Sequence, residues 1–162
     1  MAKRIMTSFV CALLCFTACA TITNIAQCLN LELTAACLSQ FPFRDNSNPQ
    51  NSLLGFVRGS LTGDYLSFLT PLSDAMRVDE AGVSDLAQVT PSMTNQFYAF
   101  VTSAGFSNHV VCAYCEIMTN GAIRSKTFIR SQRGLMTKTN EVQTVIRQID
   151  DSWRIVEWDV DE

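Results

Sequence analysis

Glu116 and Tyr114 are the residues whose chemical types and spacing could support catalysis. A carboxyl group whose pKa is raised by apolar walls exchanges protons near neutral pH, and a tyrosine hydroxyl polarises a carbonyl group. Residues two apart on a strand point to the same face, so both side chains would enter one pocket. A single carboxylate has no catalytic partner, however. We therefore favour a structural role, in which Glu116 reaches the rim and pairs with Ser125 or a lysine.

Cysteine and histidine are the other residue types that could bind a metal or react. Cys112 and Cys115 have the spacing of a zinc or redox motif, but residues three apart on a strand point to opposite faces. There is no second cysteine pair, and His109 is the single histidine, so we expect neither a metal site nor a cofactor. His109 stands at a strand start, where we expect a solvated loop position. Asp64 is expected to cap a helix.

Two hairpins are expected to position these side chains. The first comprises Val110–Thr119 and Ala122–Arg130 around Asn120-Gly121, a dipeptide typical of type I′ turns, which need positive φ at both central residues. The second comprises Glu141–Ile149 and Trp153–Val160 around Asp150-Asp151-Ser152. Together they predict a four-stranded antiparallel sheet.

The two-residue turn also predicts which side chains face the helices. It pairs Glu116 with Ser125 and Tyr114 with Thr127, and it leaves the basic residues of the returning strand on the other, solvated face. The expected pocket is then lined by Cys112, Tyr114, Glu116, Met118, Ser125 and Thr127. The opposite face would carry Val111, Ala113, Cys115 and Ile117, an apolar row that could support dimerisation.

Helical signals precede the sheet. Asn48 with Pro49 begins a helix that ends at Gly63, and Asp64 begins a second helix that ends near Thr70-Pro71. Apolar spacing predicts further helices over Thr21–Gln40 and Met93–Ala104, whereas Asp79–Ser92 is acidic and turn-rich. Three glycines lie four apart in the first of these helices, at positions 55, 59 and 63. They either allow a close approach to the sheet or are tolerated at a cost in stability.

The last strand is expected to close the fold. Trp153 and Ile155 share one strand face, so we expect them to seal the sheet against the helices. Arg154, Val156 and Trp158 would then point the other way, with Arg154 in water.

The N-terminus has the pattern of an export signal. Lys3-Arg4 is followed by the apolar run Ile5–Phe16 and by small residues up to Ala20, after which cleavage would fit. One alternative is a lipoprotein signal with the lipid on Cys19, although Phe16 stands where such signals usually carry leucine. Another is a retained anchor, because the uncharged stretch is long enough to cross a bilayer. All three alternatives place the domain outside the cytoplasm, as a secreted, periplasmic or membrane-anchored protein.

Removal of this leader would leave four cysteines, Cys28, Cys37, Cys112 and Cys115. An even number in an exported chain suggests disulfide bonds, whose pairing stays open. The alternative is that they are buried free thiols that pack like small hydrophobic residues.

Charge argues against a general nucleic-acid binder, since the formal net charge is −3 and becomes more negative once the leader is removed. One basic run contains no acid: Arg124, Lys126, Arg130, Arg133 and Lys138. We interpret it as a solvated strand face that is balanced by the acidic C-terminal segment, rather than as a surface for anionic lipid, glycan or nucleic acid.

The order of these elements resembles the nuclear-transport-factor-2-like superfamily, from about Asn48 to Asp159. The most similar parts are the segment Leu61–Pro71 and the Trp-x-Ile pattern of the last strand. The resemblance implies an α+β fold in which N-terminal helices pack on a curved four-stranded antiparallel sheet, a cone or roll that holds ligands inside it. It also implies dimerisation through the sheet. The superfamily includes isomerases, cyclases, dehydratases, transport adaptors and exported domains, so it predicts the fold better than the function.

We therefore expect a leader over residues 1–20, a helical segment and linker over 21–47, and a nuclear-transport-factor-2-like domain over 48–162. The expected function is non-catalytic: an exported domain that binds a small apolar ligand or a protein partner, with a homodimer as a further expectation. The protein would contact a membrane only through the leader or through a lipid on Cys19. The alternative is a small lyase or isomerase that uses Glu116 and Tyr114 in the cone pocket.

Overall fold

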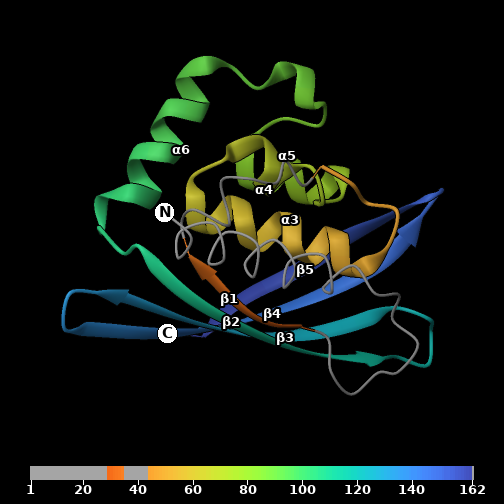
Figure 1. Ribbon diagram of the computed structural model, residues 1–162. Helices are drawn as coiled ribbons and strands as arrows, with labels where there is room; N and C mark the ends of the chain where they lie inside the picture. The colour runs from red at the N-terminus through yellow and green to blue at the C-terminus, as the bar shows by residue number, and fades with distance from the viewer. Residues whose placement is uncertain (1–28, 35–43, 162) are drawn as a thin grey trace, which may run out of the picture.

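Helices cover one face of an antiparallel sheet in the computed structural model, which describes residues 29–34 and 44–161 (Figure 1). The predicted leader lies outside the described residues. The helical layer comprises α3 (Pro49–Thr62), α4 (Tyr65–Leu69), α5 (Asp74–Ala81) and α6 (Pro91–Ser103), with a short 3-10 helix η1 (Leu86–Gln88) before α6. The sheet comprises β1 (Leu29–Thr34), β2 (Asn108–Ile117), β3 (Ile123–Arg133), β4 (Met136–Ile149) and β5 (Ser152–Asp161).

The helix boundaries follow from the capping residues. Asn48 Oδ1 accepts the backbone N–H of Asn51 at 2.8 Å and begins α3, and Gly63 ends it with φ at 74°. Asp64 caps α4 through the backbone N–H of Ser67. The predictions for these two helices and for α6 are confirmed. Helix α5, which Ser73 caps, was not predicted.

The four strands that follow the helices form the predicted antiparallel sheet, which is not closed into a barrel. The strand order is β1-β2-β3-β4-β5, so β1 and β5 are the edges. Over residues 29–34, strand β1 corrects the helix predicted over Thr21–Gln40, the rest of which lies outside the described residues. Leu29, Leu31 and Leu33 alternate with polar residues, which is the period of a strand, and this segment pairs antiparallel with β2.

The turn between β2 and β3 corrects the predicted register. Gly121 has φ at 79°, but Asn120 is not among the residues with positive φ, so a type I′ turn does not form. Instead the backbone N–H of Gly121 bonds to Met118 O and that of Met118 to Ala122 O. This longer loop pairs Ile117 with Ile123 and Cys115 with Ser125. A shift of one residue moves every side chain of β2 to the other face.

A bulge between β4 and β5 corrects the predicted orientation of Trp158. Ile146 pairs with Ile155, whereas the adjacent Val145 pairs with Glu157, so Val156 is an extra residue on β5. Trp158 therefore points toward the helices, where it packs against Phe56 and Phe68. Arg154 was expected in water but is half-buried and donates to Thr70 O.

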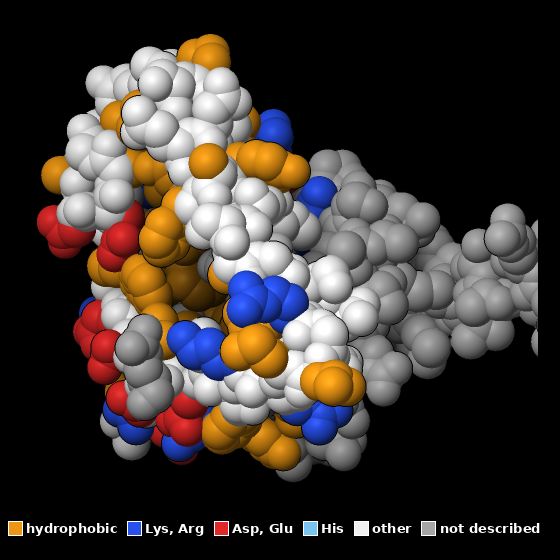
Figure 2. Space-filling view, turned by 90° about the vertical axis from the view of Figure 1, so that its left-hand side faces the viewer, with side chains coloured by type: hydrophobic (Ala, Val, Ile, Leu, Met, Phe, Trp, Pro, Cys, Tyr) orange, Lys and Arg blue, Asp and Glu red, His pale blue; other side chains and the backbone are white. Residues whose placement is uncertain are grey.

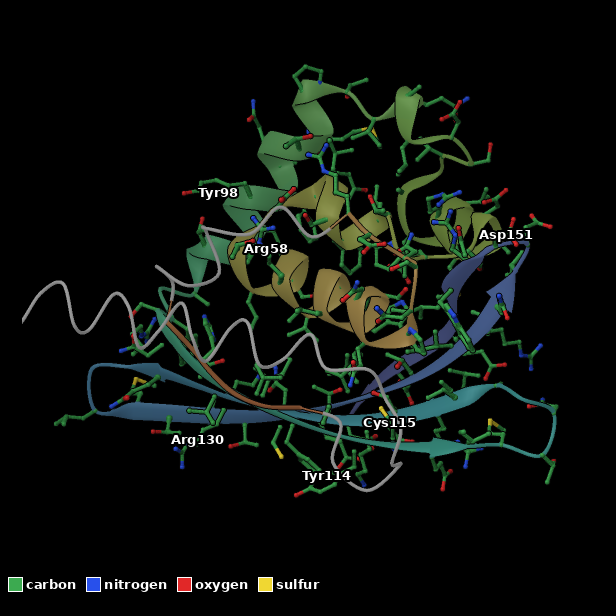
Figure 3. The ribbon with its side chains drawn as sticks, turned by 45° about the vertical axis from the view of Figure 1, so that its right-hand side comes forward. Arg58, Tyr98, Tyr114, Cys115, Arg130 and Asp151 are labelled. Atoms are coloured by element: carbon green, nitrogen blue, oxygen red, sulfur yellow. The ribbon has the colours of Figure 1, made fainter. Side chains whose placement is uncertain are left out.

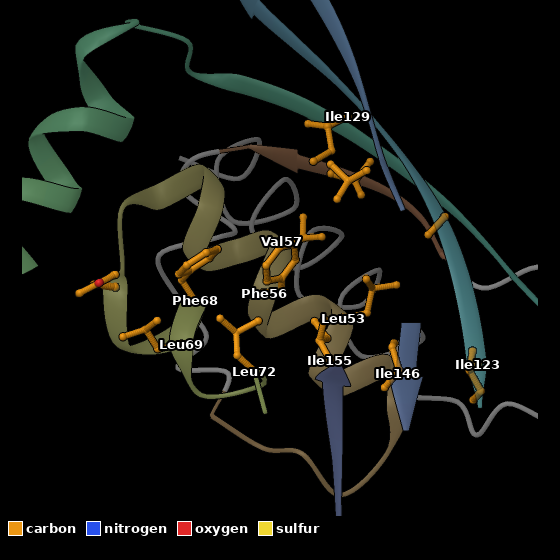
Figure 4. Packing of buried hydrophobic residues seen from close by; sticks show 14 residues of the cluster. Leu53, Phe56, Val57, Phe68, Leu69, Leu72, Ile123, Ile129, Ile146 and Ile155 are labelled. Carbon is orange, nitrogen blue, oxygen red and sulfur yellow. The ribbon is translucent and has the colours of Figure 1, made fainter. Parts of the chain in front are cut away.

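The core lies between the helices and the sheet (Figure 4). Leu53, Phe56 and Val57 of α3 pack with Ile146 and Ile155 of the sheet. Backbone hydrogen bonds fasten the start of β5 to the helical layer: Ile155 N–H donates to Pro71 O at 2.8 Å, and Ser73 N–H donates to Ile155 O at 2.9 Å. Ile155 is fully buried, as expected, and Trp153 is partly buried against the core.

Candidate functional site

Four of the six predicted pocket residues do not face the helices. Tyr114 is 53% exposed and lies on the outer face of the sheet, away from the helices (Figure 3). Glu116 is exposed on the same face, and its carboxylate accepts from Arg124 at 3.0 Å. Cys112 shares this face in the register of β2, and Met118 belongs to the loop that follows the strand. The prediction for these four residues was therefore wrong, because it depended on a register that is shifted by one residue.

Ser125 and Thr127 do face the helices. Both are fully buried on β3, and their hydroxyl groups are 3.1 Å apart. Val111 and Ala113 face the same way and belong to the core, so the apolar row predicted for a dimer interface is wrong. Cys112 has a free thiol, and its hydrogen bond with Tyr114 raises the pKa of that hydroxyl. The predicted disulfide bonds stay a prediction.

Five aromatic rings form a connected cluster between the helices and β5. We define this aromatic cluster as Phe56, Tyr65, Phe68, Phe97 and Trp158. The centroid of Phe97 on α6 lies 4.7 Å from Tyr65 and 5.1 Å from Phe68, and that of Trp158 lies 5.5 Å from Phe56. Phe97 and Trp158 are only partly buried, so the cluster ends at a surface. Aromatic pairs at such distances stabilise one another beyond the area that they bury.

A hollow lined by hydrophobic side chains opens between the helical layer and the sheet (Figure 2). It lies at the end of the molecule where α6 and the β3–β4 turn are found (Figure 1). Helix α6 packs on α3 and α4, and none of its residues is fully buried, so it leaves this end of the sheet incompletely covered. We call this hollow the aromatic recess, after the aromatic cluster, whose ring Phe97 belongs to α6 at this end of the molecule.

The helix-facing side of β4 carries polar groups. Asn140 Oδ1 and Thr144 Oγ1 are buried on the helix-facing side of β4 and have no hydrogen-bond partner. Thr144 lies opposite Trp158 in the sheet. Unpartnered buried oxygen atoms are costly, because nothing replaces the hydrogen bonds that water would give them. Both atoms are closed off from solvent, so a ligand would reach them only after the side chains that cover them had moved aside.

His109 is buried on β2, whereas the sequence predicted a solvated loop position. Its Nδ1 lies 2.8 Å from Ser131 Oγ, and burial lowers the pKa of its imidazole. The shifted register explains this difference, since it turns His109 toward the helices along with Val111.

Charged groups stand at the rim of the recess. Arg133 reaches from β3 to donate to Ala104 O at 2.8 Å and lies over the ring of Phe106, which fastens the end of α6 to the sheet. Lys138 pairs with Ser131 in the register and is exposed. On the helical side, Glu80 accepts the indole N–H of Trp158 at 3.0 Å. Burial raises the pKa of Tyr65, and Glu80 raises it further.

The register divides the predicted basic run between two faces. Arg124, Lys126 and Arg130 are exposed on the outer face, where Arg124 pairs with Glu116 and Lys126 with Glu141. Arg133 and Lys138 instead lie beside the β3–β4 turn, on the helix-facing side of their strands. The outer part of the run is thus an exposed strand face, as expected, but the acidic partners of Arg124 and Lys126 are Glu116 and Glu141 and not the acidic C-terminal segment.

Sequence reasoning missed the recess, although part of it was readable. The alternation of Asn140, Val142 and Thr144 marks one face of a strand, but the face becomes clear only when Val142 is known to be buried. Trp158 was misplaced because no local signal predicted the bulge.

Within residues 29–34 and 44–161, no cluster of three or more histidine, cysteine or acidic residues could hold a metal ion. No helix of that same part is long and apolar enough to cross a membrane. The chain matches no protein-family model, and searches of curated proteins and of solved structures returned no match.

Proposed function

We propose that this protein is an exported, non-catalytic binding domain that holds a small apolar ligand with a ring system in the aromatic recess. The observation that supports the proposal best is the combination of partly exposed rings, Phe97 and Trp158, with the unpartnered buried oxygen atoms of Asn140 and Thr144. Ligand pockets are typically apolar cavities with a few polar groups that fix the orientation of the ligand.

The recess suggests how such a ligand would be held. A ring would stack against Phe97 and Trp158, whose own neighbours are aromatic. Once the side chains that cover these buried atoms move aside, a hydroxyl or N–H group on the ligand would donate to Asn140 Oδ1 or pair with Thr144 Oγ1. An acidic substituent would point to the rim, where Lys138 is exposed.

The enzymatic alternative has less support. It required apolar walls around Glu116 to raise its pKa, but Glu116 lies on the exposed outer face and pairs with Arg124. Within this proposal, the helices and the sheet form the open cone of the nuclear-transport-factor-2-like superfamily. Export rests on Lys3-Arg4 and the apolar run that follows. Nothing in the proposal involves nucleic acid or a cofactor.

Tryptophan fluorescence tests the proposal. The chain has two tryptophans, so Trp153→Phe leaves Trp158 as the single reporter in the recess. We expect anilinonaphthalene sulfonate, an aromatic probe with an acidic group, to bind this variant and to quench Trp158. Adding Phe97→Ala should weaken binding about fivefold, because one stacking ring is lost, which is worth about 1 kcal/mol.

The matched control is Tyr114→Ala, which removes an exposed ring from the outer face and should leave the affinity unchanged. Near-ultraviolet circular dichroism must show that each variant keeps its packed core. Equal affinities in the Phe97→Ala and Tyr114→Ala backgrounds would exclude the recess as the binding site. If Phe97→Ala alone weakens binding, native mass spectrometry of protein from its natural host would identify any ligand that stays bound.

A further inference from the structure

A second cavity lies at the opposite end of the molecule from the aromatic recess. It has a volume of about 710 Å³ and is formed where the β4–β5 turn meets the start of α5 and the segment before α3. Figure 3 labels Asp151 at this end, across the molecule from Tyr98 of α6. Leu86 is the single hydrophobic residue of its lining, which otherwise consists of arginine, aspartate, hydroxyl and amide side chains. We call this cavity the polar groove.

Several charged groups of the polar groove are already used by the fold. Arg77 donates to Leu72 O at 3.0 Å and to Ser84 O at 3.1 Å, and it forms an ion pair with Asp74. Asp45 accepts from Ser47 and Asn51, which lowers the pKa of its carboxyl. Asp85 caps the 3-10 helix through the N–H of Ala87. None of these groups needs a ligand.

Three charged groups of the lining remain: Arg154, Arg44 and Asp151. Arg154 is half-buried and uses one donor nitrogen, Nη1, on Thr70 O. Burial lowers the pKa of its guanidinium and the nearby Arg77 lowers it further, while Asp74 raises it. Asp74 is thus the acid between two arginines and already pairs with Arg77. The lining as a whole has four aspartates and three arginines. Arg44 and Asp151 are exposed at the edge of the groove.

The groove has a rigid frame. Thr70 O, which accepts from Arg154, also accepts from the side-chain amide of Asn46 at 3.0 Å. The backbone of Asn46 in turn accepts from Trp153 N–H at 2.8 Å. Asn46, Thr70 and Arg154 are therefore held in place before a ligand arrives, which reduces the entropy cost of ordering this part of the lining.

We propose that the polar groove is a binding site for a free α-amino acid. Its carboxylate is held by the guanidinium of Arg154, with Arg44 nearby, and its ammonium group by the carboxylate of Asp151. Guanidinium groups bind carboxylates through two parallel hydrogen bonds. Arg154 lines the groove, and with its Nη1 bonded to Thr70 O its other donors are Nε and Nη2. The polar lining suits a zwitterion, because both charges find a partner of opposite sign.

Calorimetry and thermal unfolding with the standard L-amino acids, each added separately at millimolar concentration, test this site. At least one of them should bind with one-to-one stoichiometry and raise the melting temperature. The N-acetyl derivative of that amino acid lacks the ammonium group, and its amide lacks the carboxylate, so both should bind at least about tenfold more weakly. Retained binding of either derivative would overturn the proposal.

Two variants locate the site. Arg154→Gln should reduce the affinity at least about tenfold, and Asp151→Asn, which changes an exposed turn residue, should reduce it without affecting the fold. The matched control Arg130→Gln removes an exposed arginine from the outer face and should bind like the wild type. If no amino acid binds, or if Arg154→Gln and Asp151→Asn both bind like the wild type, the proposal is wrong. Binding of anilinonaphthalene sulfonate to the aromatic recess is independent of either result.

Discussion

Arg58 and Arg77 are buried to the same extent, with 7% of each residue exposed, but their surroundings differ. Arg77 donates to two carbonyl groups and pairs with Asp74. Arg58 Nε and Nη1 have no hydrogen-bond partner, and its Nη2 lies 3.7 Å from Asp64 Oδ2. Burial accordingly lowers the pKa of Arg58 more than Asp64 raises it. A buried cation without partners destabilises a fold, whereas a fully bonded one joins the segments around it.

Methionine in place of Arg77 should therefore destabilise the protein, whereas methionine in place of Arg58 should not. Arg77→Met should reduce the free energy of unfolding by about 2–3 kcal/mol, because it leaves Leu72 O without its donor and breaks the link to Ser84. Arg58→Met should be neutral or should stabilise the protein by about 1 kcal/mol, because methionine fills similar space at no cost in desolvation. Urea denaturation of both variants measures the difference. A loss of equal size in the two variants would contradict this account.

For single residues, the sequence predicts a role when that role depends only on neighbours in the chain. Asn48 and Asp64 are helix caps because their side chains bond to backbone groups three residues away, and no distant contact is needed. His109 and Arg58 could not be predicted in the same way. Their burial depends on which segments pack over them, and that depends on the register of the sheet and on the helix packing.

The pair formed by α3 and α4 shows why the glycine at position 59 is present. A Cβ atom built on Gly59 would lie 2.3 Å from the backbone nitrogen of Phe68, so the two helices touch at this point. Of the two alternatives that the sequence left open, close approach is correct. The neighbour is α4, however, and not the sheet. Phe68, which this contact positions, belongs to the aromatic cluster.

Gly59→Ala should therefore destabilise the protein by about 3 kcal/mol, although alanine favours a helix by about 1 kcal/mol. The backbone of Phe68 cannot move away without shifting α4 as a whole. The matched control is Gly134→Ala in the β3–β4 turn, where φ is 58° and nothing lies within 4 Å. This control should cost about 1–2 kcal/mol from backbone strain alone. Thermal and chemical denaturation of both variants measure the two losses of stability. A smaller loss for Gly59→Ala than for Gly134→Ala would refute the close contact.

Most elements could be predicted because their ends carry strong local signals. The register could not, since Asn120-Gly121 allows either a two-residue turn or a longer loop in which Gly121 alone takes positive φ. That choice decides which face of β2 is buried, and the predicted pocket failed with it. Strand β1 was missed because three leucines two apart were interpreted within a longer helical pattern.

For the whole molecule, the order of helices and strands was enough to predict an α+β fold, but not where its cavities lie. The aromatic recess and the polar groove occupy opposite ends, and each is formed by segments that are distant in sequence. The outer face of the sheet is a third surface. It carries Tyr114 and Phe128, whose ring centroids are 6.1 Å apart, and ion pairs from Arg124 and Lys126 flank the rings.

The predicted homodimer is now best placed on this outer face. An outer face with two rings, beside which Arg124 and Lys126 already have acidic partners, can be covered at little electrostatic cost, because these ion pairs stay intact. We expect the wild type to sediment as a dimer at high micromolar concentration. Tyr114→Lys should convert it to a monomer, because the new charge would be buried without a partner. The control Leu135→Lys changes the fully exposed leucine of the β3–β4 turn and should leave the dimer intact.

A wild type that sediments as a monomer would exclude the dimer. A dimer that persists in Tyr114→Lys but dissociates in Leu135→Lys would instead move the interface to the end of the molecule that holds the aromatic recess, where it would block access to the ligand.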